Sequence, residues 1–550
     1  MENNLNTTQH VDGVAGLQKR KMSKWSMAFM IYCFTAAGAF GIEEMISSSG
    51  PGITLIMLVL IPLFWAIPTC CAVSELSALM PEENALYVWT KEAFGEMWGF
   101  FVSWWNILVI YFGEASFVVL AVGYAAKFIP MSATGMLIFK VGMIVVFTVI
   151  NLIGMKEVAL IDTIFAILIL AAFAVVIVVG LCHWQYNPMV PMKPEGSDVF
   201  SCIGVSICIG IWMYCGYPCV AYTAGEVSNP EVIPKGFKIA IPIIILSYIL
   251  PTIAGLVSVG KWEYWGVGGA ENVDYATVLT QHLGPIWGVI FLIIAVISQF
   301  AIFNSYIMAG SRCFFVLADD HLCPHFLTKL SKSRKVPYWP ILIVAAVTML
   351  MMNFDFSVIV TITCPLSMMY IIVMSFAFVK LRKKYPVEER GGAYYVKGGK
   401  AMELYIMLAP SLVGIVGVLV NGAEYFLLGL TGIICSVLFY IFFKKIYGGL
   451  YVNDPIGHPI NEGTGLAQGD IPRIGIFAMM AGGLLLLGSL FLTWYMGSWG
   501  EEYYLEAYGS GIMSNFWGMI HIARYGGIGM IILGALLYFI GVKKDPFTKE

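Results

Sequence analysis

Residues 35–52 read TAAGAFGIEEMISSSGPG, and they interrupt an apolar stretch that is long enough to cross a lipid bilayer. The interruption combines small residues, with glycine at positions 38 and 41, and two adjacent carboxylates, Glu43 and Glu44. In lipid, every backbone N–H and C=O group must be hydrogen-bonded within its segment, so a weakened helix is tolerated only where protein or a water-filled cavity covers it. This stretch therefore predicts a membrane helix that is broken midway and lies beside a cavity.

The composition indicates a membrane protein. Of the 550 residues, 59% are hydrophobic and 12% are charged, whereas a soluble chain has about 25% charged residues. A large soluble protein with a very apolar core is excluded, because many runs of about 18 residues or more carry no charge, as membrane spans do. The net charge of −3 gives no indication of a nucleic-acid partner.

Apolar windows predict about 14 membrane helices. They are expected at 25–46, 52–80, 94–127, 134–154, 159–182, 199–222, 236–259, 285–317, 338–353, 356–380, 402–420, 424–445, 473–496 and 517–541. If both termini are cytoplasmic, 26 of the 31 lysine and arginine residues lie on the inner side. This asymmetry satisfies the positive-inside rule, so we expect a multi-pass protein of the cytoplasmic membrane.

The same windows predict the domain organisation. The basic N-terminal tail runs directly into an apolar span with no small-residue cleavage site, which favours a retained first helix over a removed signal peptide. The expected units are a cytoplasmic tail (1–24), two five-helix repeats (25–182 and 199–380), a cytoplasmic loop (381–400), helices 11 and 12 (401–446), a second cytoplasmic loop (447–472), two additional helices (473–541) and a cytoplasmic tail (542–550).

A second interruption lies in the sixth predicted helix, where residues 214–218 read YCGYP. Pro218 removes one helical hydrogen bond and clashes with the preceding turn. Helices 1 and 6 hold corresponding places in the two five-helix halves, and paired interruptions there indicate an inverted-repeat transporter with its site near the bilayer midplane. Glycine and proline also occur in membrane helices simply to allow close packing, but the matched positions favour the transporter.

Three further segments carry a family resemblance. AVSELSALMPEENALYVWTKEAFGEMWGF (72–100), AGEVSNPEVIPKG (224–236) and ADDHLCPHFLTKLSKSRKVPYWPI (318–341) resemble the amino acid–polyamine–organocation (APC) superfamily of permeases. The resemblance, which spans about 25–445, implies an all-α polytopic fold of the LeuT type, a 5+5 inverted repeat with discontinuous helices 1 and 6. It implies alternating access for amino acids or related organic amines, with no cofactor. Helices 13 and 14 are additional to it.

The resemblance also implies where the substrate binds. Backbone N–H groups near Gly38 and Gly41 are expected to hold a substrate carboxylate, because a helix N-terminus carries partial positive charge. The expected contacts are Ala37, Gly38, Phe40, Gly41, Trp212, Tyr214, Gly216 and Tyr306. The chain departs from the family pattern at Pro218, where some members carry glutamate, and near Ile169, where some carry a coupling lysine. The driving partner, a proton or a counter-substrate, and the oligomeric state are left open.

Three carboxylates stand out inside predicted spans, where a charge is costly and therefore a functional candidate. Glu114 is expected to line the cavity; a structural carboxyl is the alternative. Glu43 and Glu44 are about 100° apart on a helix, so only one is expected to face the cavity, and an outer-vestibule charge is the alternative. "GIEE" (41–44) resembles "GIED" of polyamine and related amino acid transporters, where a carboxylate would hold an ammonium group or the coupling proton.

Other polar residues are assigned lesser roles. Glu44, Glu75 and Glu226 are coupling or gating candidates, the last two as ion-pair residues near inner helix ends, and Asp162 is expected to be a solvated helix end. The 12 cysteines and seven histidines show no metal-ligand spacing. Metal sites are therefore not expected.

Rival functions are separated by specific features. A polyamine or diamine transporter on the same fold would bind a ligand without a carboxylate. A membrane enzyme or redox subunit would need paired histidines or a nucleophile with its base, and a transporter-like sensor would bind without flux. ATP drive is not expected because the phosphate-binding Walker pattern is missing from the sequence.

Overall fold

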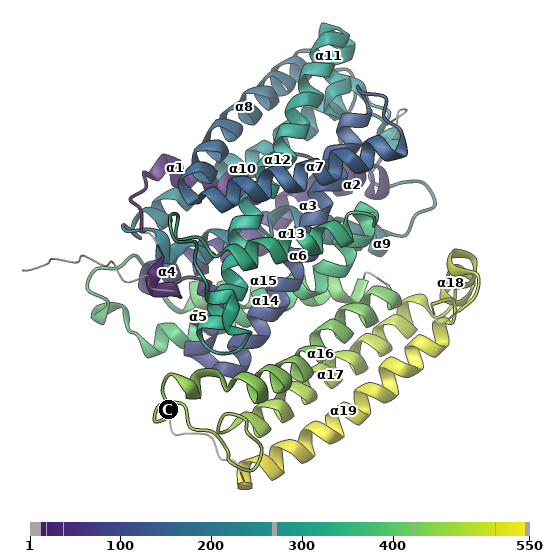
Figure 1. Cartoon of the computed structure of the whole chain (residues 1–550). Coiled ribbons are helices and arrows are strands. Elements are labelled where there is room, and N and C mark those ends of the chain that lie inside the picture. Colours follow the sequence, from purple (N-terminus) through teal and green to yellow (C-terminus); the bar gives the residue numbers. More distant parts are fainter. Residues whose placement is uncertain are drawn as a thin grey trace, which may run out of the picture.

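A computed structural model describes residues 13–17, 19–36, 38–266, 272–420, 422–511 and 513–544 of the chain. Within these residues the fold is helical, and β-structure is limited to isolated bridges (Figure 1). Twelve helical segments in them are long and apolar enough to cross a membrane, by length and composition. The prediction of an all-α polytopic membrane protein is confirmed.

The first half of the core runs from the N-terminus to the loop before residue 199. Its helices are α1 (Lys24–Thr35), α2 (Ile42–Ser49), α3 (Pro51–Ile61), α4 (Ile67–Leu79), α5 (Ala85–Phe94), α6 (Glu96–Ala126), α7 (Ala133–Ile153) and α8 (Met155–Cys182). One π-helical turn (Pro62–Ala66) joins α3 to α4 into a single span. The single span expected at 25–46 is divided into two short helices, α1 and α2.

The second half of the core runs from residue 199 to residue 384. Its helices are α9 (Val199–Tyr214), α10 (Val232–Val259), α11 (Tyr275–Leu283), α12 (Pro285–Asp319), α13 (Tyr338–Met351) and α14 (Phe356–Lys384). α13 covers the span expected at 338–353 but has only 14 residues. α1 packs against α8, α10 and α12, while α6 packs against α12 and α14, so the two halves interlock around α1 and α6.

The remaining helices are α15 (Gly399–Val420), α16 (Ala423–Tyr447), α17 (Asp470–Met496), α18 (Gly500–Tyr508) and α19 (Phe516–Lys544). α16, α17 and α19 run side by side along one flank of the molecule, in green to yellow in Figure 1. α17 and α19 meet through glycines: a Cβ at Gly475 would lie 2.6 Å from the carbonyl oxygen of Gly534, and one at Gly482 2.6 Å from that of Gly527. Small residues allow this close approach in a membrane, where packing holds helices together.

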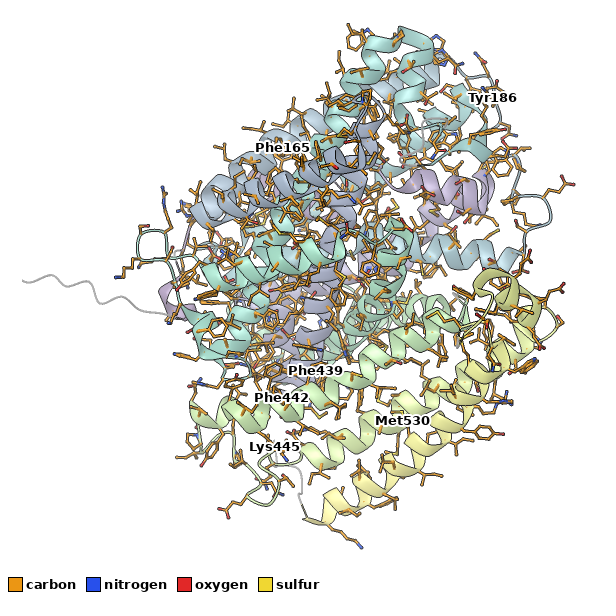
Figure 2. All side chains as sticks on the ribbon, turned by 45° about the vertical axis from the view of Figure 1, so that its right-hand side comes forward. Phe165, Tyr186, Phe439, Phe442, Lys445 and Met530 are labelled. Atoms are coloured by element: carbon orange, nitrogen blue, oxygen red, sulfur yellow. The ribbon has the colours of Figure 1, made fainter. Side chains whose placement is uncertain are left out.

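Large apolar side chains cover the outside of the bundle, as a lipid-facing surface requires. Figure 2 shows Phe439 and Phe442 projecting from α16, and their side chains are 42% and 55% exposed. Segments that the charge distribution assigns to one side contact each other. The ion pair between Lys91 of α5 and Asp320, which follows α12, joins two inner segments, and the bond from Tyr495 near the end of α17 to Asp198, which precedes α9, joins two outer ones. We call these two sides the inner and outer faces.

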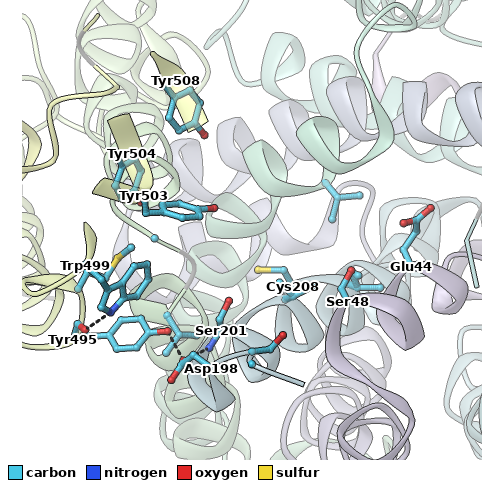
Figure 3. A pocket seen from close by; sticks show the side chains of 18 of the residues that line it. Glu44, Ser48, Asp198, Ser201, Cys208, Tyr495, Trp499, Tyr503, Tyr504 and Tyr508 are labelled. Atoms are coloured by element: carbon cyan, nitrogen blue, oxygen red, sulfur yellow. Dashed lines mark hydrogen bonds between the residues drawn. The ribbon is translucent and has the colours of Figure 1, made fainter. Parts of the chain in front are cut away.

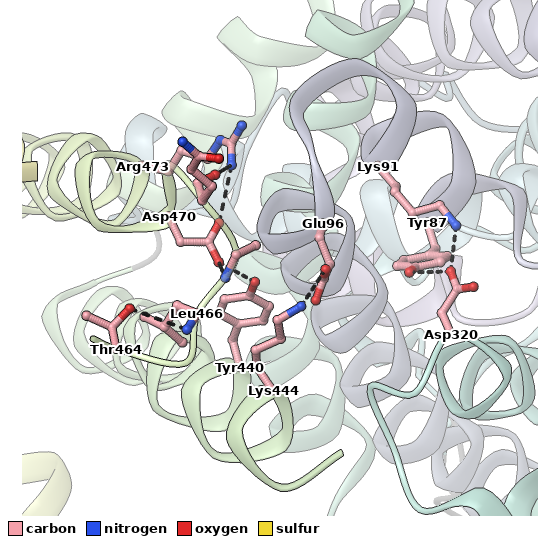
Figure 4. A network of polar contacts seen from close by, with 12 residues as sticks. Tyr87, Lys91, Glu96, Asp320, Tyr440, Lys444, Thr464, Leu466, Asp470 and Arg473 are labelled. Atoms are coloured by element: carbon pink, nitrogen blue, oxygen red, sulfur yellow. Dashed lines mark hydrogen bonds and ion pairs between the residues drawn. The ribbon is translucent and has the colours of Figure 1, made fainter. Parts of the chain in front are cut away.

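A buried polar network on the inner face fastens the C-terminal helices to the core (Figure 4). Lys444 of α16 pairs with Glu96 at the start of α6 at 2.8 Å. On α17, Asp470 accepts a hydrogen bond from the hydroxyl group of Tyr440 and pairs with Arg473 at 3.3 Å. Lys444 thus joins α16 to α6, and Tyr440 joins α16 to α17. Removing one partner of such a buried pair would leave an uncompensated charge.

Candidate functional site

The first membrane helix breaks after Thr35 and resumes at Ile42. Ala37 lies outside the described residues. Gly38 (φ 112°) and Gly41 (φ 93°) have positive φ values, a backbone conformation that glycine adopts without steric cost. Space is also restricted there, since a Cβ at Gly38 would lie 2.5 Å from the ring of Phe173 and one at Gly41 2.9 Å from the ring of Trp212. Glycine at positions 38 and 41 therefore permits the break in the helix and leaves room for the rings of Phe173 and Trp212.

The second break follows Tyr214, where α9 ends and a 3₁₀ segment (Tyr217–Tyr222) begins. A Cβ at Gly216 would lie 1.8 Å from the carbonyl oxygen of Phe34, so the two breaks are in backbone contact. The hydroxyl group of Tyr248, on α10, donates to the carbonyl oxygens of Thr35 (3.2 Å) and Met213 (2.9 Å). The predicted paired interruptions are confirmed, and one tyrosine joins them.

Two small cavities lie beside the breaks, each of about 10 Å³. The first is lined chiefly by Thr35, Phe40, Phe117, Trp212, Gln299 and Tyr306. The second lies on the other side of Phe117, Trp212 and Tyr306, and includes Gly113 and Cys364. Such a volume holds about one water molecule, so this conformation is closed around the central site.

Aromatic rings form most of the wall between and above these cavities. The ring of Phe117 lies 5.8 Å from that of Trp212 and 5.2 Å from that of Tyr306, measured between centroids. Trp212 also meets Phe356 of α14 edge-to-face at 5.0 Å. Aromatic faces attract cations, so this site suits an ammonium group together with an apolar chain.

Two polar atoms in the first cavity are left without a partner. Thr35 Oγ1 and Gln299 Oε1 are buried and have no hydrogen-bond partner among the described residues. A buried polar atom without a partner costs about 1–3 kcal/mol. Both atoms can accept a hydrogen bond from an ammonium group, so a substrate amine would satisfy them.

Glu43 lies at the start of α2, on the outer side of Phe40, and is fully buried. Its carboxylate accepts hydrogen bonds from the backbone N–H of Gly41 (2.8 Å) and from the hydroxyl group of Tyr124 (3.2 Å). The N-terminal end of α2 thus already holds a protein carboxylate. The Gly41 N–H, one of the groups expected to bind a substrate carboxylate, is occupied in this conformation.

The remaining predicted site residues lie apart from the first cavity. Glu114 accepts a hydrogen bond from Thr348 of α13 (3.2 Å) and lies beside Gly310 of α12. Tyr214 packs against the rings of Tyr217 and Tyr248. Neither is among the described residues that line the two small cavities, so their contact with substrate stays a prediction.

Glu75 and Glu226 both form buried ion pairs on the inner face. Glu75 pairs with Arg382 (3.0 Å) and Arg390 (2.7 Å), which fastens the 381–400 loop to α4. Glu226 pairs with Arg312 of α12 at 2.7 Å. These contacts close the inner side beneath the breaks, and a gating role for them stays a prediction.

Asp162 is not the solvated helix end that the sequence predicts. It is fully buried in α8 and accepts hydrogen bonds from Asn304 (3.1 Å) and Ser305 (2.8 Å) of α12. The prediction is wrong because α12 covers this turn of α8 with polar side chains. The hydrogen bonds from Asn304 and Ser305 make this burial tolerable. Both residues are more than 140 positions from Asp162 in the sequence, so local patterns could not reveal them.

Sequence reasoning missed Thr35, Phe117, Tyr248 and Gln299. A signal existed for Gln299, because a polar amide in the apolar first half of the span at 285–317 stands out much as Glu114 does in its own span. For Thr35, Phe117 and Tyr248 there was none, because threonine and aromatic residues are common in membrane helices and only the packing of α1, α6 and α10 brings these three to one place.

Comparison with known proteins agrees with this geometry. Residues 22–444 match the family model described as amino acid permease. A probable polyamine transporter of Arabidopsis thaliana is 24% identical over 400 residues, covering 72% of this chain and 78% of its own. The serine/threonine exchanger SteT of Bacillus subtilis is 28% identical (51% and 64% covered), and the branched-chain amino acid permease BcaP of Lactococcus lactis is 26% identical (54% and 68% covered).

Proposed function

We propose, from the premise that the chain belongs to the amino acid permease family, that it carries amino acids or related organic amines across the cytoplasmic membrane by alternating access. Membership of the family makes it a secondary transporter and not an enzyme. The observation that carries the choice of substrate is the central site itself, where two broken helices, aromatic rings and unpartnered oxygen atoms surround one small cavity.

The site recognises the amine end of a substrate through negative partial charges. α1 and α9 both end beside the cavity, and the C-terminal end of a helix carries partial negative charge. Thr35 Oγ1 and Gln299 Oε1 add two acceptors, and the rings of Phe117 and Trp212 add their faces. An ammonium group placed here would meet acceptors from two broken helices at once.

Alternating access follows from closures on both sides of the site. On the outer side, Trp212 and Phe356 meet above the cavity. On the inner side, the Glu226–Arg312 and Glu75–Arg382 pairs hold the loops together. The described conformation is closed at both, and we propose that transport opens one closure at a time around the bound substrate.

A second candidate, a polyamine or diamine transporter, is favoured by the Glu43–Gly41 contact. A substrate carboxylate arriving at the start of α2 would find the Gly41 N–H already occupied by the carboxyl group of Glu43. A substrate with amines only does not need this N–H group. The Arabidopsis relative is named as a probable polyamine transporter, which supports the same reading.

The proposal also covers the membrane and the driving partner. The distribution of lysine and arginine supports a cytoplasmic membrane with both described ends inside. The buried carboxylates Glu43, Glu114 and Asp162 are compatible with a coupled proton, and the name of the exchanger SteT supports a counter-substrate. Uptake measured with and without a pH gradient, and with and without substrate inside the liposomes, distinguishes a coupled proton from a counter-substrate.

The test is uptake into proteoliposomes that hold the purified chain. Labelled neutral, acidic and basic amino acids are compared with putrescine and spermidine, with and without an imposed pH gradient, and with and without unlabelled substrate inside. We expect saturable uptake of at least one amine-bearing substrate, weakened by Gln299→Met. The matched control is Gln185→Met, an exposed amide in an outer loop. Uptake of none of these compounds, or equal uptake by empty liposomes, would overturn the proposal.

A further inference from the structure

A cavity of about 980 Å³ opens on the outer face, between the core and the C-terminal helices. Its core side comes from α2, α9 and the start of α14, and its far side from the end of α17 and from α18. Figure 3 shows Glu44 and Ser48 on one side and the aromatic residues of the C-terminal helices on the other. We call this space the outer cavity.

The charged groups of the outer cavity are of one sign. Glu44, Asp198 and Asp355 line it, and none of the lining residues that the structure describes is lysine, arginine or histidine. Lys193 and Lys140 lie near enough to act on Asp198 and Asp355, but neither lines the cavity. A hollow lined by carboxylates raises the local concentration of cations.

The Asp198 carboxylate is held in its ionised form. Burial acts to raise the pKa of Asp198, but hydrogen bonds from the Tyr495 hydroxyl group and from backbone N–H groups outweigh it, so the pKa lies below its usual value. The bond from Tyr495 is 2.6 Å long and that from the Ser201 N–H is 2.8 Å. Asp198 therefore contributes negative charge at neutral pH.

The far wall of the outer cavity is aromatic. The rings of Trp499 and Tyr503 meet edge-to-face at 5.7 Å, and those of Tyr503 and Tyr504 at 5.3 Å. Tyr504 is buried and accepts a hydrogen bond from the backbone N–H of Ala423 (2.8 Å), which fixes the row in place. The exposed rings of Trp499 and Tyr503 offer faces and edges to an alkyl chain and faces to its ammonium group.

The floor of the outer cavity leads to the central site. Cys208 and Phe356 belong to the lining, and Phe356 meets Trp212, which lines both central cavities. A ligand held in the outer cavity therefore lies directly outside the closure formed by Trp212 and Phe356. The aromatic wall, however, comes from residues beyond 444, outside the part of the chain that matches the permease family.

We propose that the outer cavity is a capture site for organic cations, specifically primary amines on an alkyl chain such as diamines, before they enter the central site. This inference rests on the proposed function, since it names the substrate class of the same route. Carboxylates bind an ammonium group through charge-assisted hydrogen bonds, while the aromatic wall packs against the alkyl chain. In this proposal α17 and α18 supply the aromatic wall, which residues 22–444, the part that matches the family, do not provide.

The test measures binding apart from flux. Labelled putrescine is titrated into the full chain in nanodiscs, for wild type and for the triple variant Glu44→Gln, Asp198→Asn and Asp355→Asn. Asparagine caps helix N-termini about as well as aspartate, so α9, which Asp198 caps through the Ser201 N–H, keeps its cap while the charges are lost. Glu195→Gln, an exposed carboxylate in the same outer loop that does not line the cavity, is the control.

We expect the triple variant to weaken putrescine binding about tenfold at low salt and less at high salt, because salt screens exposed charges. Glu195→Gln should differ from wild type by less than about twofold. Tyr503→Leu removes the ring and should bind putrescine about threefold more weakly than Tyr503→Phe, which keeps it. Should the triple variant fail to fold, the two Tyr503 variants decide the outcome.

The two proposals fail in different ways. Putrescine binding that is equal in wild type and triple variant, or equal in Tyr503→Leu and Tyr503→Phe, would overturn the capture site. If wild type transports amino acids but binds no putrescine, the capture site is also overturned while the transporter stands. If putrescine binds in a manner sensitive to the triple variant but no compound is transported, the capture site stands and the transport proposal fails.

Discussion

The hydroxyl group of Tyr248 lies 3.2 Å from the carbonyl oxygen of Thr35, the last residue of α1. The same hydroxyl group lies 2.9 Å from the carbonyl oxygen of Met213, near the end of α9. A helix that stops inside the membrane leaves its last carbonyl groups without intrahelical donors. One side chain of α10 therefore serves the exposed ends of both broken helices and ties them together.

Tyr248→Phe removes this hydroxyl group and little else. We expect it to lower the free energy of unfolding by about 1–3 kcal/mol, because buried carbonyl groups lose their donor, and to slow transport. Thermal denaturation of the purified protein, together with an uptake assay, measures both effects. Tyr264→Phe, at an exposed residue of an outer loop, is the control, and an equal melting temperature for both variants would contradict the assigned role of Tyr248.

Thr35→Val and Gln299→Met remove the two unpartnered oxygen atoms of the central cavity with little change in shape. A structural role would make each variant less stable. Since these atoms have no partner among the described residues, we expect unchanged or raised stability with about tenfold weaker substrate affinity, each measured on the same preparation. Lower stability with unchanged affinity would show that they serve the fold and not the substrate.

Glu43→Gln keeps an acceptor for the Gly41 N–H but removes the ionisable carboxyl group at the start of α2. We expect the affinity for putrescine to fall about tenfold, as a charge-assisted interaction is lost, while the affinity for a neutral amino acid rises. Competition binding with both ligands gives the ratio. Glu114→Gln, which alters a carboxyl group bonded to Thr348, should shift the ratio less, and equal shifts would contradict the prediction.

Gly216→Ala and Gly113→Ala add the same methyl group at two glycines near the central site. A Cβ at Gly216 would overlap the Phe34 carbonyl group at 1.8 Å, whereas a Cβ at Gly113 meets nothing within 4 Å. We expect Gly216→Ala to cost about 1–3 kcal/mol or more, as overpacking does, and Gly113→Ala to fold normally. Size-exclusion profiles and melting temperatures compare the two. Normal folding of Gly216→Ala would disprove the close contact of the breaks.

We expect the stability of the protein to depend on pH through Glu83, a buried residue on the inner face. Burial raises its pKa well above the usual value, the Glu226 carboxylate raises it further, and Arg312 opposes them. A raised pKa in the folded state means that ionisation opposes folding. The stability from this group is complete below about pH 4, the pKa of an exposed glutamate, and is lost as the pH rises toward the folded-state pKa.

Glu83→Gln keeps the acceptor for the Glu226 N–H, 2.7 Å away, and cannot ionise. We therefore expect a higher melting temperature than wild type at pH 8 and no difference at pH 4. Melting curves at both pH values check this. A variant that is less stable than wild type at pH 8 would show that the ionised carboxylate supports the fold through Arg312.

Local chemistry alone predicted the spans and both breaks. Hydrophobic run length specifies which segments cross the membrane, and the glycines at 38 and 41 and the proline at 218 weaken the helices wherever the rest of the chain lies. These properties belong to a few neighbouring residues, so they can be read without the fold.

The direction of each polar side chain could not be read in this way. Asp162 is buried because Asn304 and Ser305 cover it, and Glu114 lies against Thr348 because α13 packs there. A helical pattern gives the spacing of residues around one helix, but the rotation of that helix against its neighbours depends on contacts between distant segments.

By itself, then, the sequence determined a polytopic helical protein with two matched interruptions, because length and helix-breaking residues act locally. Only the tertiary structure decided which side chains meet at the breaks, that Glu43 occupies the start of α2, and that Tyr503 of α18 faces the same outer cavity as Glu44. The physical reason is that these contacts form when helices hundreds of residues apart pack together, and packing depends on the shapes of all of them at once.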